Sequence, residues 1–166
     1  MNQTTELVRL AKKGDAHAFA RLYEFLYKDL YRFALYTLQN PQDAEDAVSE
    51  TVTDAFGQMA SLREPGAFRA WMFRILTAKC NHKIRDYLKK EMELKEEFPA
   101  ASPDLHEQLD TRRAFQTLSE EDRLILSMNL FAGYSSQEIG AQLGMNPNTV
   151  RSRQSRALKK LEGLLS

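Results

Sequence analysis

The chain has 166 residues, of which 43% are hydrophobic and 28% charged, a composition that excludes a disordered protein. No apolar run approaches the ~20 residues of a membrane-spanning helix, and the first 15 residues hold no apolar core of a signal peptide. The single cysteine, Cys80, excludes an internal disulfide and a cysteine-rich zinc site. We therefore expect a soluble all-α protein of one ordinary domain or two small ones, in a reducing compartment and most simply the cytoplasm.

Charge is sorted along the chain, although 23 basic and 23 acidic residues leave no net charge. Residues 63–90 carry eight bases and two acids, a surplus of +6. The preceding residues 41–62 carry five acids and no base, and the following residues 91–110 carry seven acids and one lysine. The overall charge is therefore uninformative, and each segment needs its own interpretation.

Apolar periodicity predicts three helical stretches in the first part of the chain. The first covers residues 5–39 with a break at Gly14-Asp15, and it ends at Asn40-Pro41 because a proline moves the residue before it out of the α region. The second covers residues 42–60 and carries acids three and four positions apart on one face: Asp43, Asp46, Glu50 and Asp54. A turn at residues 64–66 then leads into a third helix over residues 67–91.

The pattern is lost in the segment KEEFPAASPDLHE, residues 95–107. It contains two prolines, small residues and no apolar periodicity, which is typical of a flexible acidic linker. The sequence therefore predicts two small helical domains, residues 1–93 and 109–166, joined by a linker over residues 94–108.

The second domain has clear helix-start signals. Ser119 precedes three acids, Ser135 and Glu138 form a capping-box pattern, and Asn146-Pro147 is a cap followed by a proline at the first helical position. These signals predict a helix over residues 136–143, a turn, and a second helix over residues 147–165. Such an arrangement is a helix-turn-helix.

The second of these helices has an apolar side and a small, polar and basic side. Arginine can donate two hydrogen bonds to guanine, and asparagine and serine bond base edges or phosphates. The polar set that favours DNA reading is Asn148, Thr149, Arg151, Ser152, Ser155 and Arg156. An ordinary corner of two helices with a solvated face is the alternative.

The basic third helix interleaves bases with aromatic residues, a combination that suits unstacked bases on a separated DNA strand. For Phe68 and Trp71 the alternative is a place in the core, and for the bases it is a solvated helix face. Acids along a single helix do not converge as a metal site requires, and the three histidines are scattered. Because no phosphate loop, nucleophile elbow or catalytic carboxylate pair is present, we expect no metal, no cofactor and no enzyme activity.

Three segments, in this order, resemble the sigma factors of the extracytoplasmic-function (ECF) subfamily, the minimal two-domain members of the sigma-70 family. NPQDAEDAVSETVTDAF, residues 40–56, is similar to region 2.2, and FRAWMFRILTAKCNHKIRDYLKK, residues 68–90, to regions 2.3 and 2.4. Residues 118–161 are similar to regions 4.1 and 4.2. The resemblance covers nearly the whole chain.

The resemblance implies a bacterial transcription initiation factor that binds core RNA polymerase and reads the −35 and −10 promoter elements. It places the polar set of the last helix at the −35 element. At the −10 element, where a base is flipped out of the stack, it places Arg63, Phe68, Trp71, Arg74, Lys79, Lys83 and Arg85. At the polymerase it places Asp43, Asp46, Ala47, Val48, Ser49 and Glu50.

The implied partners are the β′ coiled coil and the β flap of core polymerase, promoter DNA, and an anti-sigma factor. Two other interpretations stay open from the residues themselves. One is a helix-turn-helix regulator that binds duplex DNA alone, which leaves the basic and acidic helices without a role. The other is a helical interaction protein, or a degenerate sigma factor that binds polymerase but no promoter.

Overall fold

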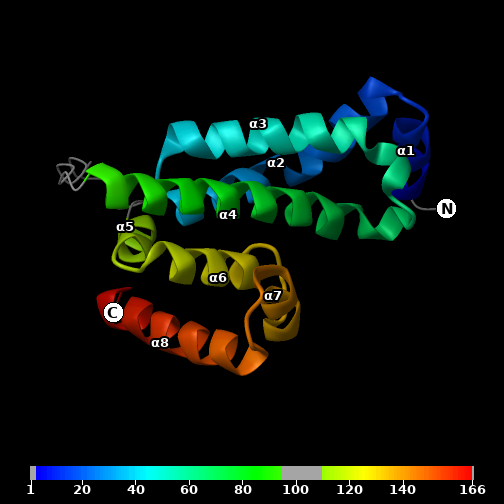
Figure 1. The fold of residues 1–166 in the computed structure, drawn as a ribbon. Coiled ribbons are helices and arrows are strands. Elements are labelled where there is room, and N and C mark those ends of the chain that lie inside the picture. The colour runs from blue at the N-terminus through cyan, green and yellow to red at the C-terminus, as the bar shows by residue number, and fades with distance from the viewer. Residues whose placement is uncertain (1–2, 95–109, 166) are drawn as a thin grey trace.

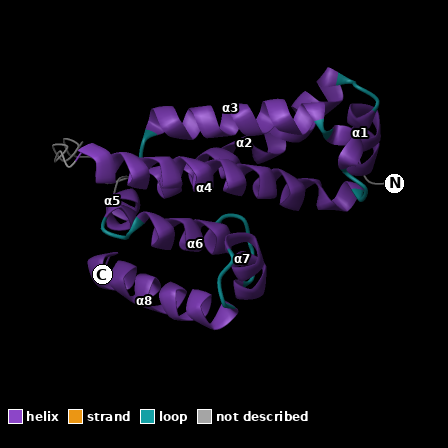
Figure 2. Ribbon diagram, viewed as in Figure 1, coloured by secondary structure: helices purple, strands orange, loops and turns teal. Residues whose placement is uncertain are grey.

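The computed structural model describes residues 3–94 and 110–165, and within these ranges it contains helices and no strand (Figure 2). The prediction of an all-α chain is therefore confirmed. The predicted linker, residues 94–108, lies almost wholly outside the described residues. The domain bounds stay a prediction.

The first unit is built from four α-helices and two short 3₁₀ turns. α1 spans Gln3–Lys12, α2 spans Ala16–Leu38, α3 spans Pro41–Gly57 and α4 spans Phe68–Leu94. Between α3 and α4 lie η1 (Met59–Ser61) and η2 (Pro65–Ala67). α2, α3 and α4 run along one another, and α1 closes the end at which η1 and η2 lie (Figure 1).

The second unit holds the four remaining helices, beside α2 and α4 in Figure 1. α5 spans Asp110–Gln116, α6 spans Glu120–Leu130, α7 spans Ser136–Leu143 and α8 spans Pro147–Leu165. α6 packs on α2 and α4 with one side and on α8 with the other. α6 therefore lies between α2 and α4 of the first unit and α8 of the second.

Side-chain caps fix the starts of α2, α3 and α6, and of these three caps only Ser119 was predicted. The side chains of Asp15, Asn40 and Ser119 each accept a hydrogen bond from the backbone N–H three residues later, at 3.1–3.2 Å. Gln39 ends α2 in the left-handed region, with φ of 61°. The chain can therefore turn sharply between α2 and Asn40.

Both units share one buried core, which was not expected from the sequence. Phe33, Phe73 and Leu76 of the first unit belong to the same buried cluster as Leu124 and Ile139 of the second. A smaller cluster in the second unit, around Phe115 and Leu161, is covered in part by the α2 side chain Tyr36. The structure thus holds the two units against each other.

Candidate nucleic-acid and partner-binding surfaces

The helix-turn-helix of α7 and α8 is fixed by its turn. Ser135 and Glu138 form the capping box, with reciprocal hydrogen bonds of 3.1 and 3.0 Å between side chain and backbone. These bonds hold the pKa of the Glu138 carboxyl below its ordinary value, so it is ionised at neutral pH. Gly144 ends α7 with φ of 69°, in the left-handed region that favours glycine.

Gly140 makes the close approach of α7 to the turn possible. An added Cβ at this position would lie 2.5 Å from the backbone oxygen of Met145. The Gly140 carbonyl also accepts hydrogen bonds from the N–H groups of Gly144 and Met145. Sequence reasoning did not identify this residue, because the approach depends on the path of the chain after the helix.

α8 separates into a buried side and an exposed polar side. Val150, Ala157 and Leu161 are buried. All six side chains predicted for DNA reading are exposed: Asn148, Thr149, Arg151, Ser152, Ser155 and Arg156. This face presents amide, hydroxyl and guanidinium donors near the N-terminus of a helix, which is the end that enters a major groove in helix-turn-helix proteins.

Arg153, in contrast, is turned toward α6. Its guanidinium lies 2.8 Å from Glu121 Oε2, and its Nε donates to Asp122 Oδ1 at 2.8 Å. Ser136 Oγ also donates to Gln154 Oε1 at 2.9 Å, which joins α7 to α8. These contacts hold α8 in place and leave Arg151 and Arg156 for the outer face.

The basic side of α4 and the acidic side of α3 meet each other. Lys79 Nζ lies 2.5 Å from Asp54 Oδ2, and Lys83 Nζ lies 3.7 Å from Glu50 Oε1. Farther along α4, the Tyr87 hydroxyl donates to the Asp43 carboxylate. The pKa of Tyr87 is raised, mainly by burial and second by this hydrogen bond. Lys83, assigned to the −10 element, and Glu50, assigned to the polymerase, therefore neutralise each other in part.

The residues predicted for the −10 element do not all reach the surface. Arg63, Arg74 and Arg85 are exposed, and Trp71, Lys79 and Lys83 are half-buried. Phe68 is only 4% exposed, with its ring centroid 6.2 Å from those of Phe19 and Trp71. It supports the start of α4 from inside, as the core interpretation of this residue expects.

The residues predicted for polymerase binding divide in the same way. Asp46, Ser49 and Glu50 are exposed, and Asp43 is half-buried. Ala47 and Val48 are buried in the packing of α3 on its neighbours. The surface that a partner can meet on this part of α3 is therefore formed by polar and acidic side chains.

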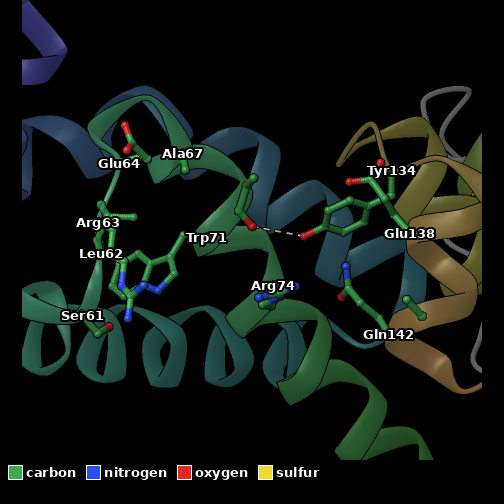
Figure 3. A pocket seen from close by; sticks show the side chains of 12 residues that line it. Ser61, Leu62, Arg63, Glu64, Ala67, Trp71, Arg74, Tyr134, Glu138 and Gln142 are labelled. Carbon is green, nitrogen blue, oxygen red and sulfur yellow. Dashed lines mark hydrogen bonds between the residues drawn. The ribbon is translucent and has the colours of Figure 1, made fainter.

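A pocket of about 430 Å³ opens beside the loop before α4 (Figure 3). Arg63, Trp71 and Arg74 lie on one wall, and Tyr134, Glu138 and Gln142 lie on the other. The Tyr134 hydroxyl donates to the Ala70 carbonyl at 3.2 Å across this pocket. The pocket thus combines an indole ring and guanidinium groups with a wall from the second unit.

Other kinds of site find no support in the described residues 3–94 and 110–165. No group of three or more His, Cys, Asp or Glu side chains is arranged to hold a metal ion there. None of the helices in this part of the chain has the length and hydropathy needed to cross a membrane. Cys80 is buried, and burial raises the pKa of its thiol, so it is a packed core residue.

Comparisons with known proteins agree with this geometry. Residues 22–91 match the family Sigma-70 region 2, and residues 108–161 match the family Sigma-70, region 4. The ECF RNA polymerase sigma factor SigM of Mycobacterium tuberculosis is 30% identical, over 96% of this chain and 83% of its own length. The RNA polymerase sigma factor SigV of Bacillus subtilis is 27% identical, over 80% and 81%.

Solved sigma factor structures have the same fold. CnrH, in complex with the cytosolic domain of CnrY, superposes with a TM-score of 0.66 at 25% identity, covering 99% of this chain and 97% of that one. The sigma factor RpoE of Bartonella quintana, in complex with the anti-sigma factor NepR, gives 0.68 at 25% identity, over 89% and 96%. Sigma factors are initiation factors rather than enzymes, and the chain is a member of the ECF sigma factors of the sigma-70 family.

Proposed function

We propose that this chain binds core RNA polymerase and directs it to promoters by reading two DNA elements with two different surfaces. The observation that carries the proposal is the division of α8. Its buried side is fixed in the second unit, whereas Asn148, Arg151, Arg156 and the hydroxyl residues between them are exposed. In this assignment α8 enters the major groove of the −35 element.

The −10 element is assigned to the start of α4 and the loop before it. Arg63 and Arg74 would contact phosphates, and the half-buried Trp71 would stack on an unpaired base of the non-template strand. Flipping a base costs a few kcal/mol, so the strand needs a pocket that compensates this loss. Lys79, Lys83 and Arg85 extend the same basic track along α4.

Polymerase binding is assigned to α3, through the exposed Asp46, Ser49 and Glu50. The β′ coiled coil is the proposed partner of this face, and the β flap is the proposed partner of the second unit. A factor with this role works where polymerase and DNA meet, in the bacterial cytoplasm. Because RpoE was solved in complex with an anti-sigma factor, we propose that an anti-sigma factor also binds and controls this chain.

The test is run-off transcription from a library of random promoters by core polymerase, with and without the purified chain. RNA that appears only with the chain, from templates sharing two spaced elements, is the expected result. A folded chain that starts no RNA on any template would refute the proposal. Binding to duplex DNA without retention of core polymerase would favour the stand-alone regulator instead.

A further inference from the structure

The first turns of α8 carry a side-chain pair on their exposed face. The Asn148 Oδ1 atom accepts a hydrogen bond from a terminal N–H of Arg151, three residues later. Both side chains are exposed, and residues three apart lie on one face of a helix. The pair therefore lies at the N-terminal end of α8, the part that contacts base edges in helix-turn-helix proteins.

The backbone under this pair is fixed by other residues. The Asn148 N–H donates to the side-chain Oδ1 of Asn146, the residue before α8, at 2.8 Å. Val150, between the two members of the pair in the sequence, is fully buried. The start of α8 therefore keeps its cap and its core contact when the side chain of Asn148 or Arg151 is removed.

The acceptor that holds Arg151 carries no charge. Arg153, two residues later, lies 2.8 Å from carboxylate oxygens of both Glu121 and Asp122, which neutralise it. The Asn148 amide restricts the guanidinium of Arg151 without cancelling its positive charge. A side chain that is restricted before binding loses less conformational entropy when it binds. Arg151 is thus a charged donor group that is oriented in advance.

The same hydrogen bond changes what Asn148 can read. A free asparagine amide offers an acceptor and a donor side by side, which suits the N6 donor and N7 acceptor of adenine. With Oδ1 bonded to Arg151, the amide has its two N–H donors left for DNA. These donors suit an acceptor such as guanine O6 or thymine O4, and the paired contact to adenine is lost.

We propose that Asn148 is a positioning residue that sets the base preference of α8 through Arg151. The inference rests on the proposed function. Asn148 Oδ1 directs the Arg151 guanidinium to O6 and N7 of one guanine in the −35 element, and Asn148 Nδ2 donates to an acceptor of the neighbouring base. The two side chains thus read DNA as one unit, and Asn148 does not read adenine by itself.

Run-off transcription by holoenzyme reconstituted from core polymerase and the full chain tests this unit. The templates are a promoter selected with the parent chain and its variants with every base pair at each −35 position. The ratio of RNA products between base pairs measures the preference at that position. The chains compared are the parent, Asn148→Ala, Arg151→Ala, the double variant and Asn148→Asp.

We expect Arg151→Ala to lower the preference for guanine at one −35 position about tenfold, through loss of a paired contact. It should also admit adenine at the neighbouring position, because Asn148 Oδ1 becomes free. Asn148→Ala should lower the same guanine preference about threefold, through loss of one neutral hydrogen bond. The double variant should lose no more guanine preference than Arg151→Ala alone, because Asn148 acts through Arg151.

Two further variants separate this role from a structural one. Asn148→Asp keeps an acceptor for Arg151, so it should keep the guanine preference while its negative charge lowers total transcription. Arg156 donates from Nε to the Ser152 carbonyl at 3.4 Å and not to Asn148, so it gives the matched control pair. The losses of transcription from Asn148→Ala and Arg156→Ala should therefore multiply.

Equal losses on every −35 variant with Asn148→Ala would show a merely structural role and overturn the proposal. Losses of guanine preference that multiply between Asn148→Ala and Arg151→Ala would overturn it as well, and so would continued rejection of adenine by Arg151→Ala. In each of these cases the parent chain still starts RNA, and the proposed function stands. A parent chain that starts no RNA would contradict the proposed function, and this inference with it.

Discussion

Replacement of Gly140 by alanine tests whether the turn of the helix-turn-helix is as tight as the structure shows. The new Cβ would lie 2.5 Å from the Met145 carbonyl oxygen, whereas ordinary van der Waals contact begins at 3.4 Å. Either α7 or the turn must therefore move by about 0.9 Å. That shift also pulls on the hydrogen bonds from Gly144 and Met145 to the Gly140 carbonyl.

The expected loss of stability follows from three contributions. Overpacking against a fixed backbone costs about 1–3 kcal/mol, and a weakened turn bond costs about 0.5–1.5 kcal/mol more. Alanine regains about 1 kcal/mol over glycine within a helix. We therefore expect Gly140→Ala to lower the free energy of unfolding by about 0.5–3.5 kcal/mol.

Urea unfolding of the full chain, followed by circular dichroism, measures this change. Gly163→Ala is the matched control, since an added Cβ there has no atom within 4 Å. It should be neutral or stabilise the chain by up to about 1 kcal/mol. If Gly140→Ala proved as stable as the parent chain while the control behaved as expected, the close approach of α7 to Met145 would be refuted.

Three further predictions concern two of the assigned surfaces and the capping box. Arg156→Ala should weaken binding to −35 duplexes by about 1–3 kcal/mol and leave polymerase binding intact in a pull-down, because the side chain is exposed on the outer face of α8; equal loss of both activities would count against the assignment. Glu50→Lys should weaken binding to core polymerase, measured by titration with core enzyme. Adding Lys83→Glu should restore the ion pair between α3 and α4 without restoring polymerase binding. Unchanged affinity of Glu50→Lys for core enzyme would remove Glu50 from the interface. Because the pKa of Glu138 is lowered in the folded chain, its ionised carboxylate stabilises the fold above the ordinary glutamate pKa of 4.5, and this contribution is lost as pH falls through the lower folded pKa. Glu138→Gln should therefore reduce the loss of stability to urea between about pH 5 and pH 3. An unchanged dependence of stability on pH in this range would contradict the capping role.

The sequence predicted the features that depend on neighbouring residues. Ser119 and the Ser135–Glu138 box cap helices as expected, because a cap needs only a side chain and the next turn of the backbone. Helix existence and helix ends follow from such short-range patterns.

Features that depend on how helices cross could not be predicted. The pairing of Lys79 with Asp54 joins residues 25 positions apart, and the contact of Arg123 with Thr37 joins residues 86 apart. Tyr36 and Tyr134 have no local pattern that distinguishes them from other aromatic core residues. Their role is set only when the second unit lies on the first.

The ion pairs between α3 and α4 bring together the acidic and basic segments whose charges cancel in the sequence. Lys79 and Lys83 are held by Asp54 and Glu50 in half-exposed ion pairs, which are worth about 0–1 kcal/mol each. Such pairs lower the positive potential that non-specific DNA binding requires, yet they are weak enough to exchange for other partners. A partner that took the α3 carboxylates would leave both lysines available to phosphate. We therefore expect the two ion pairs to weaken non-specific DNA binding by the free chain, and a partner that binds the α3 carboxylates to remove this effect.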